Sequence, residues 1–191
     1  YDENMTGFDS WFGDPIAVGD LNNDGYDDLI TDAGRYLADT GRVYIFYGSD
    51  LMDNIVDLTI TGEDTGDWFG SVITVGDLND DNYDDLLIAS TRHSSNTGKV
   101  YVYFGSELMV DSVDLTMNGV STSDYFGATI TTGDINNDNY DDTFIFADSG
   151  LVHLYYGGSS MDNVSDVNFS VTGVAWSGSI TIGNFNNDAY N

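Results

Sequence analysis

Residues 20–28 read DLNNDGYDD, and two near copies follow, DLNDDNYDD at 77–85 and DINNDNYDD at 134–142. In each copy, oxygen-bearing side chains stand at the first, third, fifth and ninth positions. Gly or Asn at the sixth position tolerates the positive φ of a sharp turn. Carboxylate, amide and carbonyl oxygens are the ligands of Ca²⁺, which takes about six to eight of them. Each copy therefore predicts one calcium-binding loop.

The predicted ligands of each loop are four side chains and the backbone carbonyl of the tyrosine at the seventh position. They are Asp20, Asn22, Asp24, Tyr26 (backbone) and Asp28; Asp77, Asn79, Asp81, Tyr83 (backbone) and Asp85; and Asp134, Asn136, Asp138, Tyr140 (backbone) and Asp142. A solvated acidic turn without metal is the alternative. Three copies favour the metal, because so many carboxylates in nine residues repel one another unless a cation offsets them.

An EF-hand also begins with oxygen ligands at the first, third and fifth positions, but it requires a bidentate Glu at position 12 and a helix on each side. Position 12 is occupied here by Thr31, Ile88 and Ile145. Short apolar runs rich in strand-forming residues follow each acidic segment. The acidic segments are therefore predicted to be hairpin loops between β-strands.

The three copies are evenly spaced, since Asp20, Asp77 and Asp134 are each 57 residues apart. Within the second unit, residues 71–76, 86–89, 99–104 and 113–117 are predicted strands, with a loop at 91–98 and no helix beyond a turn near Leu51 or Leu108. Four short strands in a repeat of this length are typical of a propeller blade. We therefore predict an all-β propeller of four-stranded antiparallel blades at 11–62, 68–119 and 125–173, forming a single domain over residues 1–191.

The two ends of the chain align with incomplete blades. Residues 1–7 correspond to a last strand, and residues 174–191 correspond to a first strand and the start of a loop. Open sheet edges pair readily with other chains. We therefore expect completion by further repeats of a longer chain or by identical subunits joined head to tail, as a ring or a filament.

Composition excludes several classes of partner. The chain has 33 acidic and 4 basic residues, with a net charge of -29, which disfavours nucleic acid and anionic membrane surfaces. Its 41% hydrophobic residues suffice for a core, there is no Cys, and no apolar run approaches the length of a membrane span. Millimolar calcium outside cells suits carboxylate-rich sites, so secretion or the cell surface is expected.

Three segments of the second repeat resemble a known family. WFG at 68–70, GDLN at 76–79 and GKVYVY at 98–103 are similar to the FG-GAP repeat of integrin alpha-subunit propellers and of related bacterial secreted proteins. This resemblance implies a β-propeller in which calcium ions brace blade hairpins on one face, without catalysis by the propeller. A fourth copy begins with Asn184 instead of Asp, and no metal site is predicted there.

The residues themselves also give little support for an enzyme. His93 lies in a predicted loop, and His153 stands where the other repeats have Tyr44 and Tyr101, which favours an aromatic-like packing role. No Gly-x-Ser-x-Gly elbow exists, and no partner is singled out for either histidine. Adjacent carboxylates such as Asp27 and Asp28 are already explained by the calcium loops. We therefore predict no catalytic residue.

Two further groups of residues bear on binding. Each repeat begins with an aromatic residue, namely Trp11, Trp68, Tyr125 and Trp176. These residues could stack on sugars, but packing between blades is the favoured role. The four cations gather near the loops on the face opposite the calcium sites; they are Arg35, Arg42, Arg92 and Lys99. That face is a candidate surface for carboxylated glycans or an acidic partner, the alternative being ordinary solubilising residues.

The sequence thus predicts a calcium-stabilised extracellular module with a structural, adhesion or assembly role. Its expected partners are a protein or glycan at the cell surface, or identical subunits. The alternative is a carbohydrate-binding accessory domain of a secreted hydrolase.

Overall fold

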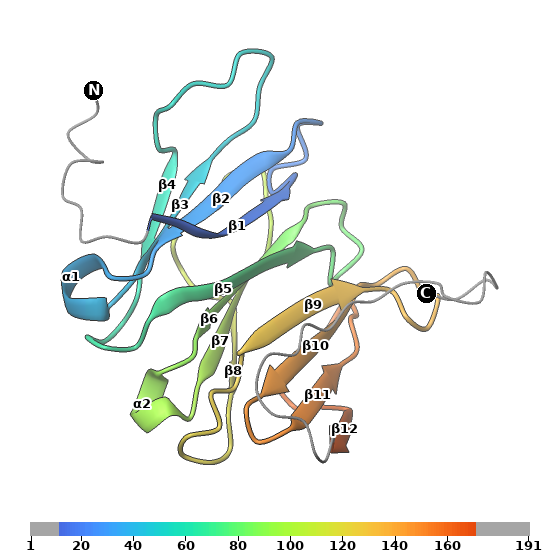
Figure 1. Cartoon of the computed structure of the whole chain (residues 1–191). Coiled ribbons are helices and arrows are strands. Elements are labelled where there is room, and N and C mark those ends of the chain that lie inside the picture. Colours follow the sequence, from blue (N-terminus) through green and yellow to red (C-terminus); the bar gives the residue numbers. More distant parts are fainter. Residues whose placement is uncertain (1–11, 171–191) are drawn as a thin grey trace.

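The computed structural model describes residues 12–170, whose strands form three four-stranded antiparallel sheets (Figure 1). The first sheet consists of β1 (Phe12–Gly19), β2 (Asp28–Ala33), β3 (Arg42–Phe46) and β4 (Leu58–Thr61). The second consists of β5 (Phe69–Gly76), β6 (Asp85–Ser90), β7 (Lys99–Tyr103) and β8 (Leu115–Asn118). The third consists of β9 (Thr129–Gly133), β10 (Asp142–Ala147), β11 (Leu151–Tyr155) and β12 (Val167–Ser170). Strand order follows the chain in each sheet, as expected of propeller blades, and the predicted fold class is confirmed.

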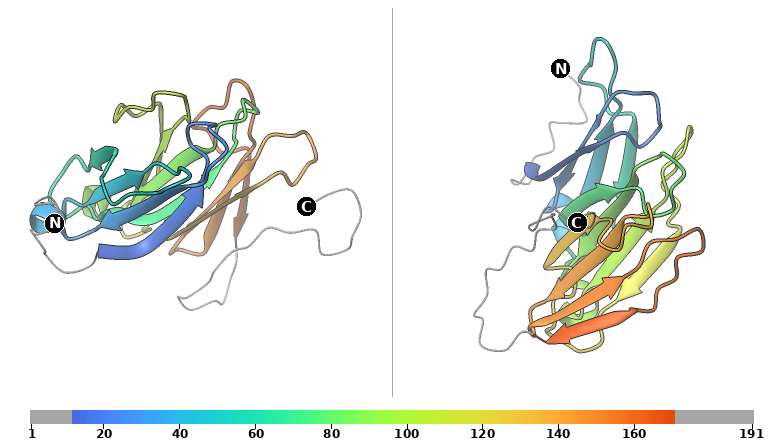
Figure 2. Two further views of the ribbon diagram at one scale, coloured as in Figure 1. Left: turned by 90° about the horizontal axis from the view of Figure 1, so that it is seen from above. Right: turned by 90° about the vertical axis from the view of Figure 1, so that its right-hand side faces the viewer.

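The three blades pack around their first strands. Strand β5 contacts β1 on one side and β9 on the other. These three strands lie next to one another, while the later strands of each blade extend away from them (Figures 1 and 2). The interior of the molecule is therefore a set of layers between neighbouring sheets.

The second blade is buried on both faces because its strands alternate between two cores. On β6, Leu86 and Ile88 belong to the cluster shared with the first blade, whereas Leu87 and Ala89 belong to the cluster shared with the third. All four side chains are fully buried. Successive side chains of a strand point to opposite faces of a sheet, so continuous apolar sequence is what a doubly covered blade requires.

Aromatic rings fill the interior between the blades. The rings of Phe69 and Tyr101 meet edge to face at 5.2 Å between centroids, and Phe126 and His153 repeat that contact at 5.2 Å in the next blade. Edge-to-face pairs stabilise by about 0.5–1.5 kcal/mol beyond their buried area. The aromatic-like role expected of His153 is confirmed.

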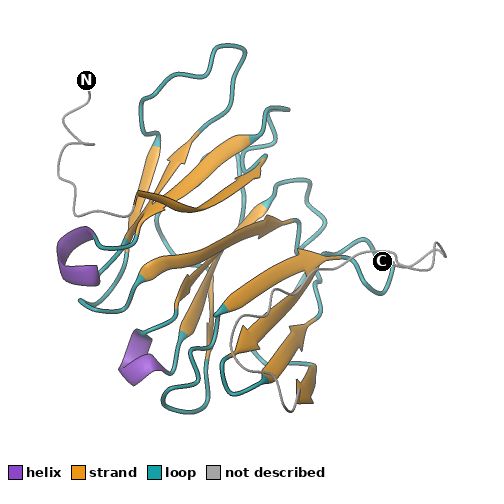
Figure 3. Ribbon diagram, viewed as in Figure 1, coloured by secondary structure: helices purple, strands orange, loops and turns teal. Residues whose placement is uncertain are grey.

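The link between the second and third strands differs from the predicted plain loop. It contains a four-residue helical turn in the first two blades, α1 (Tyr36–Asp39) and α2 (His93–Asn96). Both turns contain left-handed residues, such as Leu37 and Ala38 in α1, so neither is a regular helix. Figure 3 shows both turns at one end of the sheets, away from the loops between first and second strands.

Several sequence-based expectations concern residues outside 12–170. The partial strands at 1–7 and 174–191, together with Trp11 and Trp176, lie outside the described residues, and the single-domain organisation stays a prediction. Among the helices of the described part, none is long and apolar enough to cross a membrane.

Candidate functional site

The three acidic loops connect equivalent strands at the same end of the sheets. Each loop is closed by a strand pair between Gly and the ninth-position Asp, namely Gly19 with Asp28, Gly76 with Asp85, and Gly133 with Asp142. The three sequence copies thus become three loops of equal length on one face of the molecule.

In the first loop, the oxygens predicted to bind calcium turn toward the loop's own backbone. The amide of Asp24 donates to Oδ1 of Asp20 (3.1 Å) and to Oδ1 of Asn22 (3.0 Å). The other Asp20 oxygen accepts from Gly25 N (2.9 Å), and Asp24 Oδ1 accepts from Tyr26 N (2.9 Å). Backbone amides of the loop therefore hold the side chains from positions one, three and five.

The second and third loops repeat this arrangement. The bonds are Asp81 N to Asp77 (3.2 Å) and Asn79 (3.1 Å), Asn82 N to Asp77 (3.0 Å), Asp138 N to Asp134 (3.2 Å) and Asn136 (2.9 Å), and Asn139 N to Asp134 (3.0 Å). Tyr83 and Tyr140 likewise donate from their amides to the fifth-position carboxylates. In every loop, the side-chain atoms that could bind a metal ion are all oxygens, which fits the preference of Ca²⁺.

The ninth-position carboxylates are buried and brace the blade. In the second loop, one Asp85 oxygen accepts from Leu78 N (2.9 Å) and the other from Gly105 N (2.9 Å). Asp28 and Asp142 accept the equivalent pairs of amides. A carboxylate has roughly four lone-pair positions, so two amide donors leave capacity for an ion. These residues thus tie their loops to the end of the third strand.

Burial raises the pKa of each of these carboxyl groups. The pKa of Asp85 is raised to about 7, and the pKa values of Asp28 and Asp142 are raised to about 6. The hydrogen bonds from backbone N–H groups lower these pKa values, but burial has the larger effect. Neighbouring loop carboxylates such as Asp77 and Asp81 raise the pKa of Asp85 further. A bound cation would reverse this balance, because it favours the charged form.

The eighth-position aspartates link one loop to the next, a role that the sequence reasoning missed. Asp84 Oδ2 accepts from Asp20 N (2.9 Å), and Asp84 N donates to Asp20 O (3.0 Å). Asp141 N makes the equivalent bond to Asp77 O (2.9 Å). The recurrence of Asp at position eight of all three loops is a sequence signal for this link.

At the opposite end of the first strands, the three blades enclose a cavity of about 320 Å³. Its walls combine carboxylates, aromatic rings and small residues from repeat-related positions. The lining residues are Asp14, Asp32, Gly34, Arg35, Trp68, Ser71, Val72, Thr91, Tyr125, Ala128 and Asp148. Trp68 and Tyr125, expected to pack between blades or to stack on sugars, therefore line an opening, while the following Phe69 and Phe126 fill the core.

The cations near this cavity are engaged by their neighbours. The Arg92 guanidinium lies 3.4 Å from the centroid of the Trp68 ring, Arg42 stacks on Tyr36 at 3.6 Å, and Lys99 Nζ is 2.9 Å from Glu63 Oε2. Lys99 lowers the pKa of Glu63 through this hydrogen bond. With three carboxylates in the cavity wall, these contacts give no support to a site for carboxylated glycans.

Comparison with known proteins identifies the repeats. The family model described as FG-GAP repeat matches residues 12–46 and 69–103. The chain is 35% identical over 197 aligned residues to phosphatidylinositol-glycan-specific phospholipase D of Bos taurus, covering 85% of this chain and 24% of that protein.

Integrin alpha subunits are also similar. Integrin alpha-5 of Xenopus laevis is 31% identical over 151 residues (74% of this chain, 14% of that protein), and integrin alpha-8 of Mus musculus is 28% identical over 148 residues (72% and 14%). The chain thus spans a quarter or less of the length of these relatives.

Proposed function

Since this chain carries FG-GAP repeats, we propose that it is a calcium-stabilised, non-enzymatic propeller module that acts outside the cell in adhesion or assembly. One observation carries the proposal. Three loops with the same oxygen-bearing side chains, each held by the same backbone amides, stand at the same end of three successive blades. Calcium there would supply charge neutralisation and fix the hairpins, leaving the opposite end for partners.

Calcium titration of the chelator-stripped protein by isothermal calorimetry tests the metal. We expect three ions per chain. Asp24→Ala should remove one ion, and the triple variant Asp24→Ala, Asp81→Ala, Asp138→Ala should remove all three. Asp53→Ala is the control, because Asp53 lies in an acidic loop outside the sites. An unchanged stoichiometry in the triple variant would reject the assignment.

The cavity-bearing end is the proposed recognition face, with a protein or glycan of the cell surface as its partner. Supporting this choice, Trp68 and Tyr125 offer aromatic surface beside the carboxylates Asp14, Asp32 and Asp148. Aromatic rings flanked by a few convergent polar groups are typical of ligand pockets.

Cell binding measured by flow cytometry tests this choice of face. Labelled protein should bind in calcium and lose binding after Trp68→Ala. Leu51→Ala is the matched control, because Leu51 is 87% exposed in the link between β3 and β4. Equal binding by Trp68→Ala and wild type would place recognition elsewhere.

We also propose that the described blades pack against further blades, either of the same polypeptide or of identical subunits. Supporting this, β1 presents Phe12, Ile16 and Val18 with exposed fractions of 42%, 59% and 53%. A row of exposed apolar side chains on a strand suits the face of a neighbouring sheet. Light scattering distinguishes the two sources, because identical subunits would give concentration-dependent association that Ile16→Asp weakens.

The second candidate is an accessory domain of a secreted hydrolase. Its support is the 35% identity to a phospholipase named for phosphatidylinositol-glycan. In this case the cavity would bind the glycan portion of such a molecule. Calorimetry with a soluble inositol-glycan headgroup tests it, and binding that persists in Trp68→Ala or is absent in the wild type would contradict it.

A further inference from the structure

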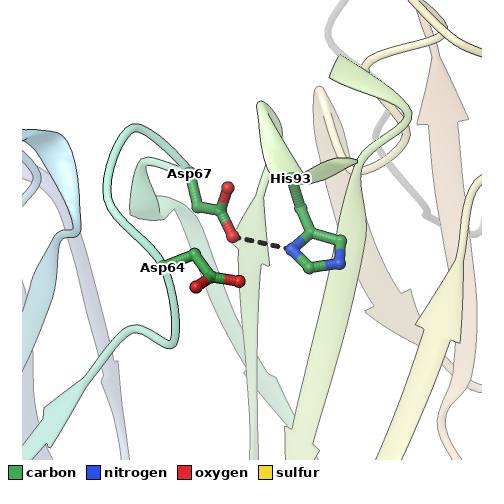
Figure 4. A group of neighbouring side chains, drawn as sticks. All are labelled: Asp64, Asp67 and His93. Atoms are coloured by element: carbon green, nitrogen blue, oxygen red, sulfur yellow. Dashed lines mark hydrogen bonds and ion pairs between the residues drawn. The ribbon is translucent and has the colours of Figure 1, made fainter. Parts of the chain in front are cut away.

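A second type of metal-binding group lies away from the acidic loops. Asp64, Asp67 and His93 bring one ligand atom each to within 4.8 Å of one another (Figure 4). Asp67 is buried, His93 is half-buried and Asp64 is exposed. We propose that these three side chains form a site for a divalent transition-metal ion of the zinc class, distinct from the calcium loops.

The cluster is not required by the fold, because the third repeat builds the same region without it. The backbone contact at this point recurs, with Arg92 N donating to Asp67 O (3.2 Å) and Asp148 N donating to Asp124 O. In the third repeat, however, Ser121 replaces Asp64. The turn between β10 and β11 is also shorter than its equivalents in the first two repeats, and it has no counterpart of His93. In the first repeat, Tyr36 stands at the position of His93. The three ligand side chains therefore occur together in the second repeat alone.

The geometry is close to that of a metal site. His93 Nδ1 and Asp67 Oδ2 form a hydrogen bond of 2.6 Å, whose proton a metal ion can displace. Two ligands about 2.05 Å from a tetrahedral ion lie roughly 3.3 Å apart, so the pair has to open by only about 0.7 Å. The exposed Asp64 carboxylate, drawn beside this pair in Figure 4, completes three protein ligands and leaves a fourth position for water.

Ligand chemistry separates this site from the calcium loops. The loops offer oxygen alone, whereas this group contains an imidazole nitrogen, which suits zinc, copper, iron and nickel. Three protein ligands with one open position suit a four-coordinate ion, while Ca²⁺ takes about six to eight oxygens. Nearby Glu63 is held by Lys99 and so is not a competing ligand.

Occupation of this site would affect the cavity. Asp67 directly precedes Trp68, which lines the cavity, and His93 directly follows Arg92, whose guanidinium stacks on Trp68 at 3.4 Å. An ion held by Asp67 and His93 would join the segment between β4 and β5 to the α2 turn. It would thereby fix the Trp68–Arg92 pair at the edge of the cavity.

Zinc titration of tag-free protein by isothermal calorimetry tests the proposal, in millimolar CaCl₂ so that oxygen-only sites are filled. One saturable zinc ion per chain is expected. His93→Asn and Asp64→Asn should each weaken zinc binding by at least about tenfold. His153→Tyr is the matched control, because it removes the other imidazole and installs the residue of the first two repeats. It should leave zinc affinity unchanged.

The NMR chemical shifts of the imidazole nitrogens give a second measurement of zinc binding that does not rely on the heat measured by calorimetry. Zinc should move the His93 nitrogens and leave those of His153 in place, while the Asp64→Asn variant should show a much smaller change at equal zinc. Absence of saturable zinc binding in the folded wild type would overturn the proposal, leaving a structural Asp67–His93 pair. Unchanged zinc affinity in folded His93→Asn would overturn it as well.

Discussion

At the scale of single residues, buried carboxylates make this protein sensitive to pH. Asp32 is 2% exposed in the wall of the cavity, where one oxygen accepts from Asp14 N at 3.2 Å. Burial raises its pKa to about 7. An unfolded Asp has a pKa near 3.9, so from about pH 4 to pH 7 the folded state binds the proton more tightly. The stability that this group contributes is present below pH 4 and is lost as the pH rises through 7.

The corresponding prediction concerns Asp32→Asn. Asn keeps an oxygen for Asp14 N but cannot ionise, so unfolding free energy should fall less between pH 5 and pH 8 than in the wild type. The difference between the two proteins should change by about 2 kcal/mol over this range. Urea unfolding in saturating calcium measures it. Parallel pH profiles for the two proteins would contradict the assigned cause.

Two glycines with the same backbone conformation should respond differently to alanine. Gly41 has φ +83° and its added Cβ would overlap the carbonyl oxygen of Phe69 in the next blade, whereas Gly66 has φ +86° and open space. We expect Gly41→Ala to cost at least about 3 kcal/mol of unfolding free energy, and Gly66→Ala about 1 kcal/mol from backbone strain alone. Chemical denaturation of the two variants compares them, and equal losses would show that packing against Phe69 is unimportant.

At the scale of elements, positions within one acidic loop have separable duties. Asp85 accepts from two backbone amides in the blade, whereas Asp81 accepts from Tyr83 N within its own loop. A substitution to Asn keeps only one acceptor oxygen. One oxygen is enough for the single bond that Asp81 accepts, but Asp85 uses both of its oxygens.

Asp85→Asn should therefore lower stability by about 1–3 kcal/mol even in chelator, through an unpaired buried amide. Asp81→Asn should lower stability only when calcium is present. Thermal unfolding of both variants with calcium and with chelator separates the two effects. If both variants were destabilised only in calcium, the bracing role of Asp85 would be wrong.

The sequence predicted the elements better than the contacts between them. Period and alternation placed the strands of the second blade within about two residues, because burial on both faces leaves a direct signature in runs such as 86–89. The left-handed turn at Leu37 and Ala38 was missed, since neither residue favours that conformation and tertiary packing imposes it. The Asp84–Asp20 link and the Asp67–His93 pair were also missed, because each joins segments whose approach depends on how the blades and their connecting loops pack.

At the scale of the whole molecule, a net charge of -29 means that carboxylates repel one another wherever no cation offsets them. Removing calcium should lower the melting temperature by roughly 15–30 °C, if three sites each at 100 times their dissociation constant contribute about 2.7 kcal/mol. Scanning calorimetry with and without chelator measures this. Magnesium at equal ionic strength is the control for simple charge screening. Unchanged melting in chelator would reject calcium as a structural ion.

The two-sided blade has a consequence for how such a chain can change over generations. A one-residue insertion within β6 would rotate Leu86 and Ile88 into the space of Leu87 and Ala89, damaging both neighbouring cores at once. Turns absorb changes in length, as the shorter third repeat illustrates, but strands do not. Duplication or loss of whole 57-residue units preserves every interface, so lineages of this protein should differ by entire blades rather than by gradual growth within them.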